Sequence, residues 1–353
     1  MLSYQVEEFG KPLARVLRDT PAPQGREVIL RVQACGVCHS DVHLQDGYFD
    51  LGGGNKVDLT RSLKPPRTLG HEIAGKVVAV GPEAQGVAVG DVRVAFPWIG
   101  CGTCPVCLAG DEHLCGAPRN LGINLDGGFA DHVVVPDAKY LLDFAPLDID
   151  QACTYACSGL TAYSALKKLG NQAAQLNAGG TLLVIGAGGV GLNGIRLGKL
   201  MYPKAKLVVA ETDKGKWDIA RAAGADEVID PAAEGAVKSL LKATGGVVAV
   251  VDFVGAASTF EFGFATLRKA GQLVSVGLFG GNTVLPTAML ALKVVTISGS
   301  YVGNLEELRE LLAFARSHKM PDLPLATQPL AEADRVVAEL KAGKIKGRTI
   351  LKP

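Results

Sequence analysis

The second half of the chain alternates short apolar runs with stretches of helical length, and this alternation strongly constrains the fold. The runs are rich in Val, Ile and Leu, and most of the stretches between them are rich in Ala, Leu and Lys. The six runs cover 181–186, 206–211, 226–230, 247–253, 272–277 and 294–300. Strands that alternate with helices form a parallel sheet covered by helices on both faces. We therefore expect an α/β domain with a doubly wound parallel sheet.

A glycine pattern at the first strand–helix junction predicts a dinucleotide site. Gly186, Gly188 and Gly191 have G-x-G-x-x-G spacing, follow an apolar strand and open a helix. They permit, in that order, a tight turn, close approach of the backbone to a pyrophosphate, and close helix–strand packing. Glu211, 20 residues after Gly191, ends the next strand and can bond the ribose hydroxyls while repelling a 2′-phosphate. NAD is therefore the expected cofactor, and a glycine-rich turn in an empty domain is the alternative.

The first half of the chain is predicted to be rich in strands. Short β-branched runs at 27–34, 73–80, 91–96 and 132–136 are separated by Gly, Pro and Asp, as is typical of strands and turns. Near the end, the chain has the pattern of two helices and a strand, at 304–318, 331–342 and 348–352. A chain of 353 residues favours about two domains. We expect this last segment to return to the first domain.

Composition excludes several classes of protein. Hydrophobic residues make up 48% of the chain and the net charge is +1, which is incompatible with intrinsic disorder. The balance of 36 basic against 35 acidic residues does not predict a nucleic-acid partner. No apolar run approaches the ~18 residues needed to cross a membrane, and the start, MLSYQVEEFGK, does not resemble a signal peptide. We therefore expect no membrane contact, a cytoplasmic location and reduced cysteines.

Four of the eight cysteines form a short cluster with metal-ligand spacing. Cys101, Cys104, Cys107 and Cys115 read C-x2-C-x2-C-x7-C. Four thiolates suit a closed, tetrahedral zinc site, and their negative charge makes the ion a poor Lewis acid, so the predicted role is structural. An iron–sulfur cluster, disulfides or free thiols are the alternatives.

A second metal site is predicted from residues far apart in the sequence. Cys38, His71 and Cys157 can supply three ligands, which is the number typical of a catalytic zinc with one open position. Residue types and positions alone leave open the alternative that these are ordinary core or surface side chains.

The motifs together resemble those of the zinc-dependent medium-chain alcohol dehydrogenases, in the same order along the chain. The segments are CGVCHSDVH, GHEIAGKVVAVG, the four-cysteine cluster, CSGLTAY and the glycine-rich loop. The resemblance implies a GroES-like catalytic domain at 1–157, completed by 302–353, and a Rossmann domain at 158–301. It also implies two zinc ions per chain, with Cys38, His71 and Cys157 holding the catalytic one. The expected reaction is the reversible, NAD-dependent oxidation of a small primary or secondary alcohol to an aldehyde or ketone.

The resemblance assigns roles near the catalytic zinc. Ser40 would bond the alcohol, and His43 would end a proton relay that passes through the nicotinamide ribose. Asp41 would orient the ligand histidine, and Glu72 would lie behind the zinc and ligate it transiently. Trp98 falls near an aromatic residue that lines the substrate pocket in similar enzymes. For His43, Asp41 and Trp98, ordinary surface, turn and core positions are the alternatives.

It also implies a set of cofactor contacts. His39 and Arg348 would reach the pyrophosphate, and Lys216 would lie near the adenosine ribose unless it is only a solvated helix residue. The full set is His39, Gly186, Gly188, Gly189, Val190, Gly191, Glu211, Lys216, Gly277, Leu278 and Arg348. Cys35 and Cys153 match no role and are expected to be small buried side chains.

Two features of segment length carry further expectations. Cys38 and His71 are 33 residues apart, roughly ten more than in similar enzymes, and long loops are often lids or binding elements. We expect segment 49–66 to border the substrate entrance or a subunit contact, with a tolerated surface insertion as the alternative. The short segment after Cys115 resembles that of the tetrameric microbial enzymes, which implies a homotetramer. A polyol dehydrogenase, a zinc-free quinone or enoyl reductase, and a non-enzymatic zinc protein remain as alternative functions.

Overall fold

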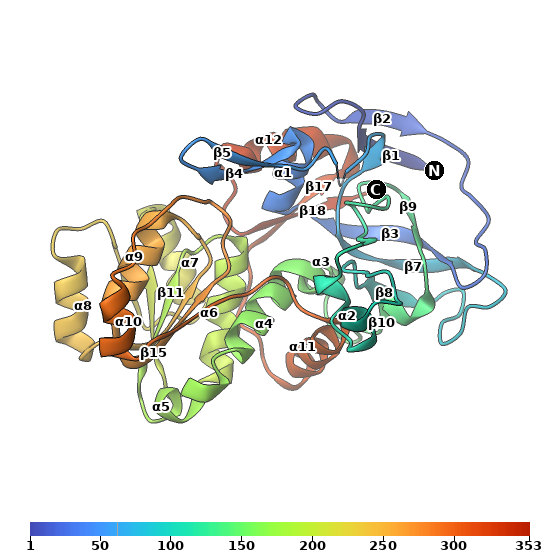
Figure 1. Cartoon of the computed structure of the whole chain (residues 1–353). Coiled ribbons are helices and arrows are strands. Elements are labelled where there is room, and N and C mark those ends of the chain that lie inside the picture. The colour runs from blue at the N-terminus through green and yellow to red at the C-terminus, as the bar shows by residue number, and fades with distance from the viewer. Residues whose placement is uncertain (62) are drawn as a thin grey trace.

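The computed structural model describes residues 1–61 and 63–353, which form two parts (Figure 1). The part on the left of Figure 1 is built on a six-stranded sheet, and the part on the right on a seven-stranded sheet. Both termini lie in the right-hand part, so the chain enters the left-hand part in its middle and then returns.

The six-stranded sheet is entirely parallel, with the order β13-β12-β11-β14-β15-β16. Its strands are β11 (Thr181–Ile185), β12 (Lys206–Ala210), β13 (Glu227–Ile229), β14 (Val247–Asp252), β15 (Leu267–Ser275) and β16 (Thr296–Gly299). The first strand, β11, lies in the centre. The next two strands are added on one side of it and the last three on the other, which is the strand order of a doubly wound Rossmann fold. The predicted fold class is therefore confirmed, although β15 begins earlier than the predicted run at 272–277.

Helices cover both faces of this sheet because every central strand is apolar on both sides. In β11, Leu182 and Val184 enter one hydrophobic cluster, while Leu183 and Ile185 enter another. The first cluster includes residues of the helix that follows β11, and the second includes residues of two later helices. The helices of this part are α5 (Ala173–Asn177), α6 (Gly189–Met201), α7 (Trp217–Ala222), α8 (Ala236–Thr244), α9 (Ala257–Thr266) and α10 (Thr287–Lys293).

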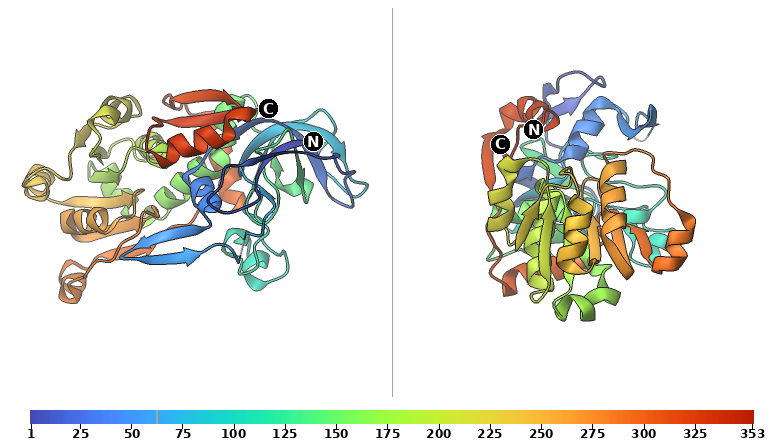
Figure 2. Two further views of the ribbon diagram at one scale, coloured as in Figure 1. Left: turned by 90° about the horizontal axis from the view of Figure 1, so that it is seen from above. Right: turned by 90° about the vertical axis from the view of Figure 1, so that its left-hand side faces the viewer.

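The seven-stranded sheet joins the two ends of the chain. Its central strand, β3 (Val28–Gly36), pairs antiparallel with strands from both ends, including the C-terminal β18 (Arg348–Lys352). The other strands are β7 (Glu72–Val80), β8 (Val92–Ala95), β9 (His132–Val135), β10 (Leu141–Leu142) and β17 (Leu325–Pro329). Figure 2 shows the C-terminal segment beside the N-terminal strands. The predicted strands and the return of the last segment are thus confirmed, whereas the exact domain limits stay a prediction.

Shorter elements complete the right-hand part. A three-stranded sheet is formed by β1 (Leu2–Val6), β2 (Ala14–Leu17) and β6 (Arg67–Thr68). The helices of the right-hand part are α1 (His39–Asp46), α2 (Pro105–Leu108), α3 (Ile149–Thr154), α11 (Leu305–Ser317) and α12 (Ala333–Lys341), and α4 (Leu160–Lys167) leads from this part into the other and packs against α6 and α11. Asn304 caps α11 by accepting a hydrogen bond from the Glu307 N–H, so this helix begins where the polar pattern predicts.

The long segment between Cys38 and His71 contains a hairpin that reaches the left-hand part. The hairpin consists of β4 (Tyr48–Gly52) and β5 (Asn55–Asp58), and residue 62 of the predicted 49–66 loop lies outside the described residues. The Gly281 N–H donates to the carbonyl oxygen of Leu51 at 2.5 Å. A Cβ on Gly52 would lie 2.6 Å from the Cα of Gly281, so this close approach of two backbones requires glycine.

Candidate functional site

Three segments bring Cys38, His71 and Cys157 together at the base of α1. Cys38 is the N-cap of α1, His71 immediately precedes β7, and Cys157 lies in a π-helical turn between α3 and α4. Such turns are rare and occur mostly at functional sites. The ligand atoms of these residues all lie within 4.8 Å of one another, and all three residues are buried. The structure therefore assembles the predicted catalytic metal cluster.

The geometry and the donor set of this cluster fit zinc. The two sulfur atoms are 3.9 Å apart, close to the separation of about 3.8 Å expected for two thiolates on a tetrahedral zinc. The hydrogen bond with Cys157 lowers the pKa of Cys38, which favours a thiolate. Both ring nitrogens of His71 are buried and have no hydrogen-bond partner in the described part of the chain. A buried nitrogen without a partner is available to bind a metal.

Asp41 supports the cluster from behind. Its carboxylate is fully buried and lies 3.5 Å from Nδ1 of His71, which leaves Nε2 for the metal. It also accepts hydrogen bonds from the Cys38 N–H at 2.9 Å and the Gly70 N–H at 3.2 Å. Burial opposes protonation of His71, but the negative charge of Asp41 raises its pKa overall.

Glu72 and Arg348 form a buried ion pair next to the cluster. Glu72 also accepts a hydrogen bond from the Ser158 N–H at 3.0 Å, and burial raises its pKa. The Arg348 side chain continues to the start of α6, where a Cβ on Gly189 would lie 2.5 Å from its Cδ. Arg348 therefore contacts both the glutamate behind the metal cluster and the first turn of the predicted cofactor helix.

The glycine-rich loop has the geometry that its motif predicts. Gly186 has a φ of +91°, and α6 begins at Gly189 with Gly188 as its N-cap. A Cβ on Gly191 would lie only 2.0 Å from the carbonyl oxygen of Gly186, whereas one on Gly188 would meet no atom within 4 Å. The free N–H groups of the first helical turn can therefore face an open surface, as a pyrophosphate site requires. Val190 follows in the same first turn.

Glu211 faces this loop from the end of β12. Its carboxylate accepts hydrogen bonds from the N–H groups of Ala187 and Asp213, both at 2.8 Å. Trp217 donates from Nε1 to the Glu211 carbonyl oxygen at 2.9 Å, which fixes the strand end. Lys216 lies 3.7 Å from a carboxylate oxygen of Asp213, the residue whose N–H donates to Glu211, so it belongs to the same turn as the predicted ribose ligand.

The remaining predicted residues lie on α1 and in the loop after β15. The Cys38 thiol lies 3.8 Å from the Ser40 hydroxyl, so Ser40 adjoins the metal cluster. The rings of His39 and His43 are 5.4 Å apart. The pKa of His43 is lowered, mainly by burial and to a smaller extent by the charge of the nearby His39. Gly277 packs against the backbone at residues 254–255, and Leu278 is about half exposed.

Aromatic side chains lie near the cluster and near α1, and the resemblance indicated only Trp98 among them. The Trp98 ring lies 5.3 Å from that of His71, and its Nε1 donates to the Ala156 carbonyl oxygen at 2.9 Å. Tyr301, whose ring lies 6.0 Å from that of Trp98, was missed because it belongs to no motif. Phe49, whose ring lies 4.6 Å from that of His43, falls in the 49–66 segment expected to border the substrate entrance, but no motif singled it out. Tyr301 follows the last parallel strand, and the carboxyl ends of such strands are where ligands bind, which is the signal that could have found it.

The four-cysteine cluster forms as predicted. The sulfur separations are 3.5 Å for Cys104–Cys107, 3.8 Å for Cys104–Cys115 and 3.9 Å for Cys101–Cys107, which again match a tetrahedral zinc. Hydrogen bonds from Thr103 lower the pKa of Cys101 to about 6. These residues fit a structural zinc, because all four ligand positions come from the protein.

Buried polar contacts attach this cluster to the rest of the protein. Glu112 accepts hydrogen bonds from the Tyr140 hydroxyl at 2.6 Å and from Lys139 at 2.9 Å. Cys35 and Cys153 lie outside both clusters and are almost fully buried, which raises the pKa of each thiol. All eight cysteines are described, and none of them forms a disulfide.

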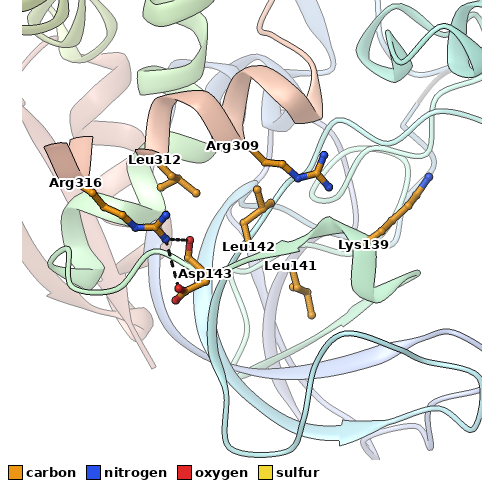
Figure 3. Close-up of a pocket in the computed structure, with 7 residues that line it drawn as sticks. All are labelled: Lys139, Leu141, Leu142, Asp143, Arg309, Leu312 and Arg316. Carbon is orange, nitrogen blue, oxygen red and sulfur yellow. Dashed lines mark hydrogen bonds and ion pairs between the residues drawn. The ribbon is translucent and has the colours of Figure 1, made fainter. Parts of the chain in front are cut away.

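A cavity of about 380 Å³ lies apart from these sites, between α11 and the segment that contains β10 (Figure 3). Its three cations each have an acidic partner: Lys139 pairs with Glu112, Arg309 with Glu306, and Arg316 with Asp143. Since neither metal cluster contributes to its lining, we do not assign the chemistry to this cavity. In the part of the chain that the structure describes, no helix has the length and apolar character needed to span a membrane.

Comparisons with known proteins agree with this geometry. Residues 24–145 match the family described as "Alcohol dehydrogenase GroES-like domain", and residues 189–317 match "Zinc-binding dehydrogenase". The NAD-dependent alcohol dehydrogenase of Sulfurisphaera tokodaii is 36% identical over 100% of both chains. An alcohol dehydrogenase of Geobacillus stearothermophilus is 33% identical over 98% of both. The crystal structure of the Aeropyrum pernix alcohol dehydrogenase superposes with a TM-score of 0.88 at 31% identity, covering 100% of both chains.

The resemblance predicted from the motifs is therefore confirmed, together with the GroES-like and Rossmann architecture and the two zinc-ligand clusters. The chain belongs to the zinc-containing medium-chain alcohol dehydrogenases.

Proposed function

We propose that this chain catalyses the reversible, NAD-dependent oxidation of a primary or secondary alcohol to an aldehyde or ketone. The observation that carries the proposal is the buried Cys38, His71 and Cys157 cluster, which offers three ligands and leaves a fourth position for a substrate. Arg348 supports it further, since it contacts both Glu72 beside this cluster and the glycine-rich loop. A metal site without a redox cofactor site, or the reverse, would not suit this reaction.

When bound, zinc would supply a Lewis acid, and the nicotinamide would accept the hydride that leaves the alcohol carbon. The residues of the chain hold and orient these groups and move the proton. We assign to Ser40, which adjoins Cys38, the acceptance of the alcohol's hydroxyl proton at Oγ while its own proton passes on through the nicotinamide ribose hydroxyl towards His43. His43 then takes up a proton at its ring and releases it to solvent, which its partial exposure and lowered pKa permit.

Asp41 and Glu72 are positioning residues in this proposal. Asp41 fixes the ring orientation of His71 and increases its basicity as a ligand, as carboxylates next to ligand histidines commonly do. Glu72 is neutralised by Arg348 and held by the Ser158 N–H, and we assign to it a transient role in exchanging the ligand at the open position.

NAD binding is assigned to the α6 terminus and the segments around it. The N–H groups of the turn at Gly188–Gly191, together with Val190, Arg348 and His39, bind the pyrophosphate. Glu211 accepts hydrogen bonds from the adenosine ribose, with Lys216 alongside. Gly277 and Leu278 line the nicotinamide end. Glu211 supports a preference for NAD over NADP as the bound cofactor, because its buried carboxylate would repel the 2′-phosphate of NADP.

Replacement of a metal ligand tests the proposal directly. In His71→Ala we expect one zinc per chain instead of two, and NADH production from alcohols at background level in a protein that still folds. The matched control is Cys153→Ser. In the native chain the Cys153 thiol donates to the Asp150 carbonyl oxygen, and a serine hydroxyl can donate in its place. Normal turnover and two zinc ions in His71→Ala would refute the assignment. A panel of simple alcohols and polyols with NAD identifies the substrate class and separates this function from a polyol dehydrogenase.

We also propose the domain division 1–157 with 302–353, and 158–301, and a homotetrameric assembly in the cytoplasm. The pairing of β18 with β3 supports the division.

Exposed apolar residues next to the edge strand β16, such as Leu292 and Val294, support the proposed tetramer, because another subunit would bury them. Six of the eight cysteines lie in the two metal-ligand clusters, where they must be reduced to bind zinc, and this supports a reducing compartment. Light scattering on the purified enzyme tests the assembly, with an expected mass four times the 36.7 kDa of one chain.

A further inference from the structure

One face of α6 carries a row of polar groups where the helix packs against the π-helical turn. α6 contacts β11 and β12 of the parallel sheet and also the turn at Tyr155–Gly159, which contains a ligand of the catalytic cluster. Gly189, Asn193 and Arg196 are four and three residues apart, so they share one face of the helix. Asn193 and Arg196 are both 0% exposed. The face that begins at the predicted pyrophosphate site therefore continues as a buried polar row.

Asn193 joins the cofactor helix to this turn. Its Nδ2 donates to the Gly189 carbonyl oxygen and to Oγ of Ser158, both at 3.3 Å. The Ser158 hydroxyl donates in turn to the Thr154 carbonyl oxygen at 3.0 Å. Because Ser158 directly follows Cys157, these hydrogen bonds hold the segment that presents a metal ligand.

Arg196 anchors the other end of the row. Its Nη1 donates to Oδ1 of Asn193 at 3.1 Å, and its Nε donates to the Pro321 carbonyl oxygen at 2.5 Å. Pro321 lies in the last segment of the chain, which leads back to the seven-stranded sheet. The side chains of Asn193 and Arg196 thus connect one helix of the left-hand part to two separate segments of the right-hand part.

The charge of Arg196 is unusual for so deep a position. Burial lowers its pKa, and the exposed Asp322 opposes this shift without forming an ion pair in the described part of the chain. A buried charge without a close carboxylate costs stability, and residues that cost stability are expected at functional sites. An apolar side chain at position 196 would fill the space but could not orient Asn193.

The row leads to Glu72, whose two carboxylate oxygens both have partners connected to α6. Oε1 accepts the Ser158 N–H at 3.0 Å, and Ser158 is held by Asn193. Oε2 pairs with Arg348, which packs against Gly189 one helical turn earlier. A shift of α6 relative to the metal cluster would therefore disturb both contacts of the carboxylate.

We propose that Asn193 and Arg196 are positioning residues, which fix the turn carrying Cys157 and, through Ser158, the Glu72 carboxylate relative to the cofactor helix. This inference rests on the proposed alcohol oxidation and adds two residues that belong to neither metal cluster. Hydride transfer depends on close alignment of the reacting carbon with the nicotinamide. Because the metal and the cofactor are held by different parts of the protein, that alignment depends on contacts between the parts, and this row is one of them.

Three substitutions along the row test the proposal: Asn193→Leu, Arg196→Met and Ser158→Ala. Each removes hydrogen bonds of the row and leaves all seven metal ligands in place. We expect kcat for alcohol oxidation to fall by roughly tenfold, the lower end of the effect of groups that orient metal ligands, while KM for NAD stays close to native. Ser158→Ala is the mildest change, since it keeps the N–H that binds Glu72 and leaves Arg196 paired with Asn193.

A second readout does not depend on turnover. Zinc has a filled d shell and no visible spectrum, so cobalt is substituted at the catalytic cluster, where its absorption bands report the ligand geometry. We expect these bands to shift in all three variants. The matched control is Gln272→Leu, which removes another buried amide of the same part, one that donates to the Lys168 carbonyl oxygen at 2.9 Å. It should lower the melting temperature and leave kcat and the cobalt bands unchanged.

The double variant Asn193→Leu with Ser158→Ala shows whether the row acts as a unit. If it does, the double variant loses no more kcat than the more impaired single variant. Losses that multiply overturn the proposal, as do native kcat and native cobalt bands in Asn193→Leu and Ser158→Ala, or an equal shift of the bands in Gln272→Leu. A zinc-loaded native enzyme that oxidises no alcohol with NAD removes the proposed function, whereas the cobalt bands still decide whether the row positions the cluster.

Discussion

The Asp41 carboxylate lies 3.5 Å from Nδ1 of His71, and neither side chain has any exposed surface. The carboxylate also accepts the N–H of Cys38, so one buried group orients two of the three ligands of the predicted catalytic zinc. This arrangement ties the start of α1 to the residue before β7. It holds together two of the three ligands, Cys38 and His71, although they come from separate segments.

Asp41→Asn is expected to weaken zinc binding and catalysis by roughly 10- to 100-fold, because the amide keeps the shape but removes the negative charge opposite His71. Zinc retention against a chelator and kcat/KM with an alcohol are the measurements. An unchanged zinc affinity would show that the charge has no part in holding the ligand.

The two glycines of the cofactor loop are expected to differ when replaced. Gly191→Ala places a Cβ 2.0 Å from the Gly186 carbonyl oxygen, so this variant should lower the melting temperature and abolish NAD binding. Gly188→Ala meets no protein atom within 4 Å and should fold normally, yet weaken NAD binding by obstructing the pyrophosphate. Calorimetric NAD binding and thermal unfolding separate the two. Equal melting temperatures for both variants would contradict the packing argument.

Glu211→Gln should reduce the preference for NAD over NADP by at least about tenfold, because the amide oxygen still accepts hydrogen bonds while the charge facing the 2′-phosphate is removed. The ratio of kcat/KM for the two cofactors is the measurement. A ratio equal to that of the native enzyme would remove Glu211 from the ribose site.

Cys107→Ser should reduce the zinc content from two ions per chain to one and lower the melting temperature, because structural zinc sites contribute folding energy. The control is His113→Gln, which changes the same short lobe at a residue outside the ligand set and should keep both ions. Metal analysis and thermal unfolding give the result. Two ions in Cys107→Ser would contradict a structural zinc at this cluster.

Alcohol oxidation should slow as the pH falls through the pKa of His43, since only the neutral ring can accept the departing proton. Burial and the neighbouring His39 lower this pKa from its ordinary value of 6.5, so the decline should lie on the acidic side of 6.5. His43→Gln should lower the rate at neutral pH and lose this acidic limb at saturating NAD. An unchanged pH profile in the variant would place the proton acceptor elsewhere.

Local motifs predicted the parts of the site that depend on local backbone geometry. Gly186, Gly188 and Gly191 specify one strand–turn–helix junction, and Cys101 to Cys115 span a single short lobe. In each case, neighbours in sequence are neighbours in space, so spacing alone indicates the function. The alternation of apolar runs with helical stretches also indicated the parallel sheet. The reason here is that each central strand must bury both of its faces, which makes the whole run apolar.

The sequence by itself therefore determined the Rossmann half, the dinucleotide loop and the four-cysteine lobe, whereas tertiary structure decided how the catalytic site is assembled. Glu72 and Arg348 are 276 residues apart and pair only because β18 joins the sheet of β3 and β7. Tyr301 carries no motif and gains its place from the end of β16 and from the strained backbone at Val302. Such contacts depend on packing between distant segments, which no local residue pattern encodes.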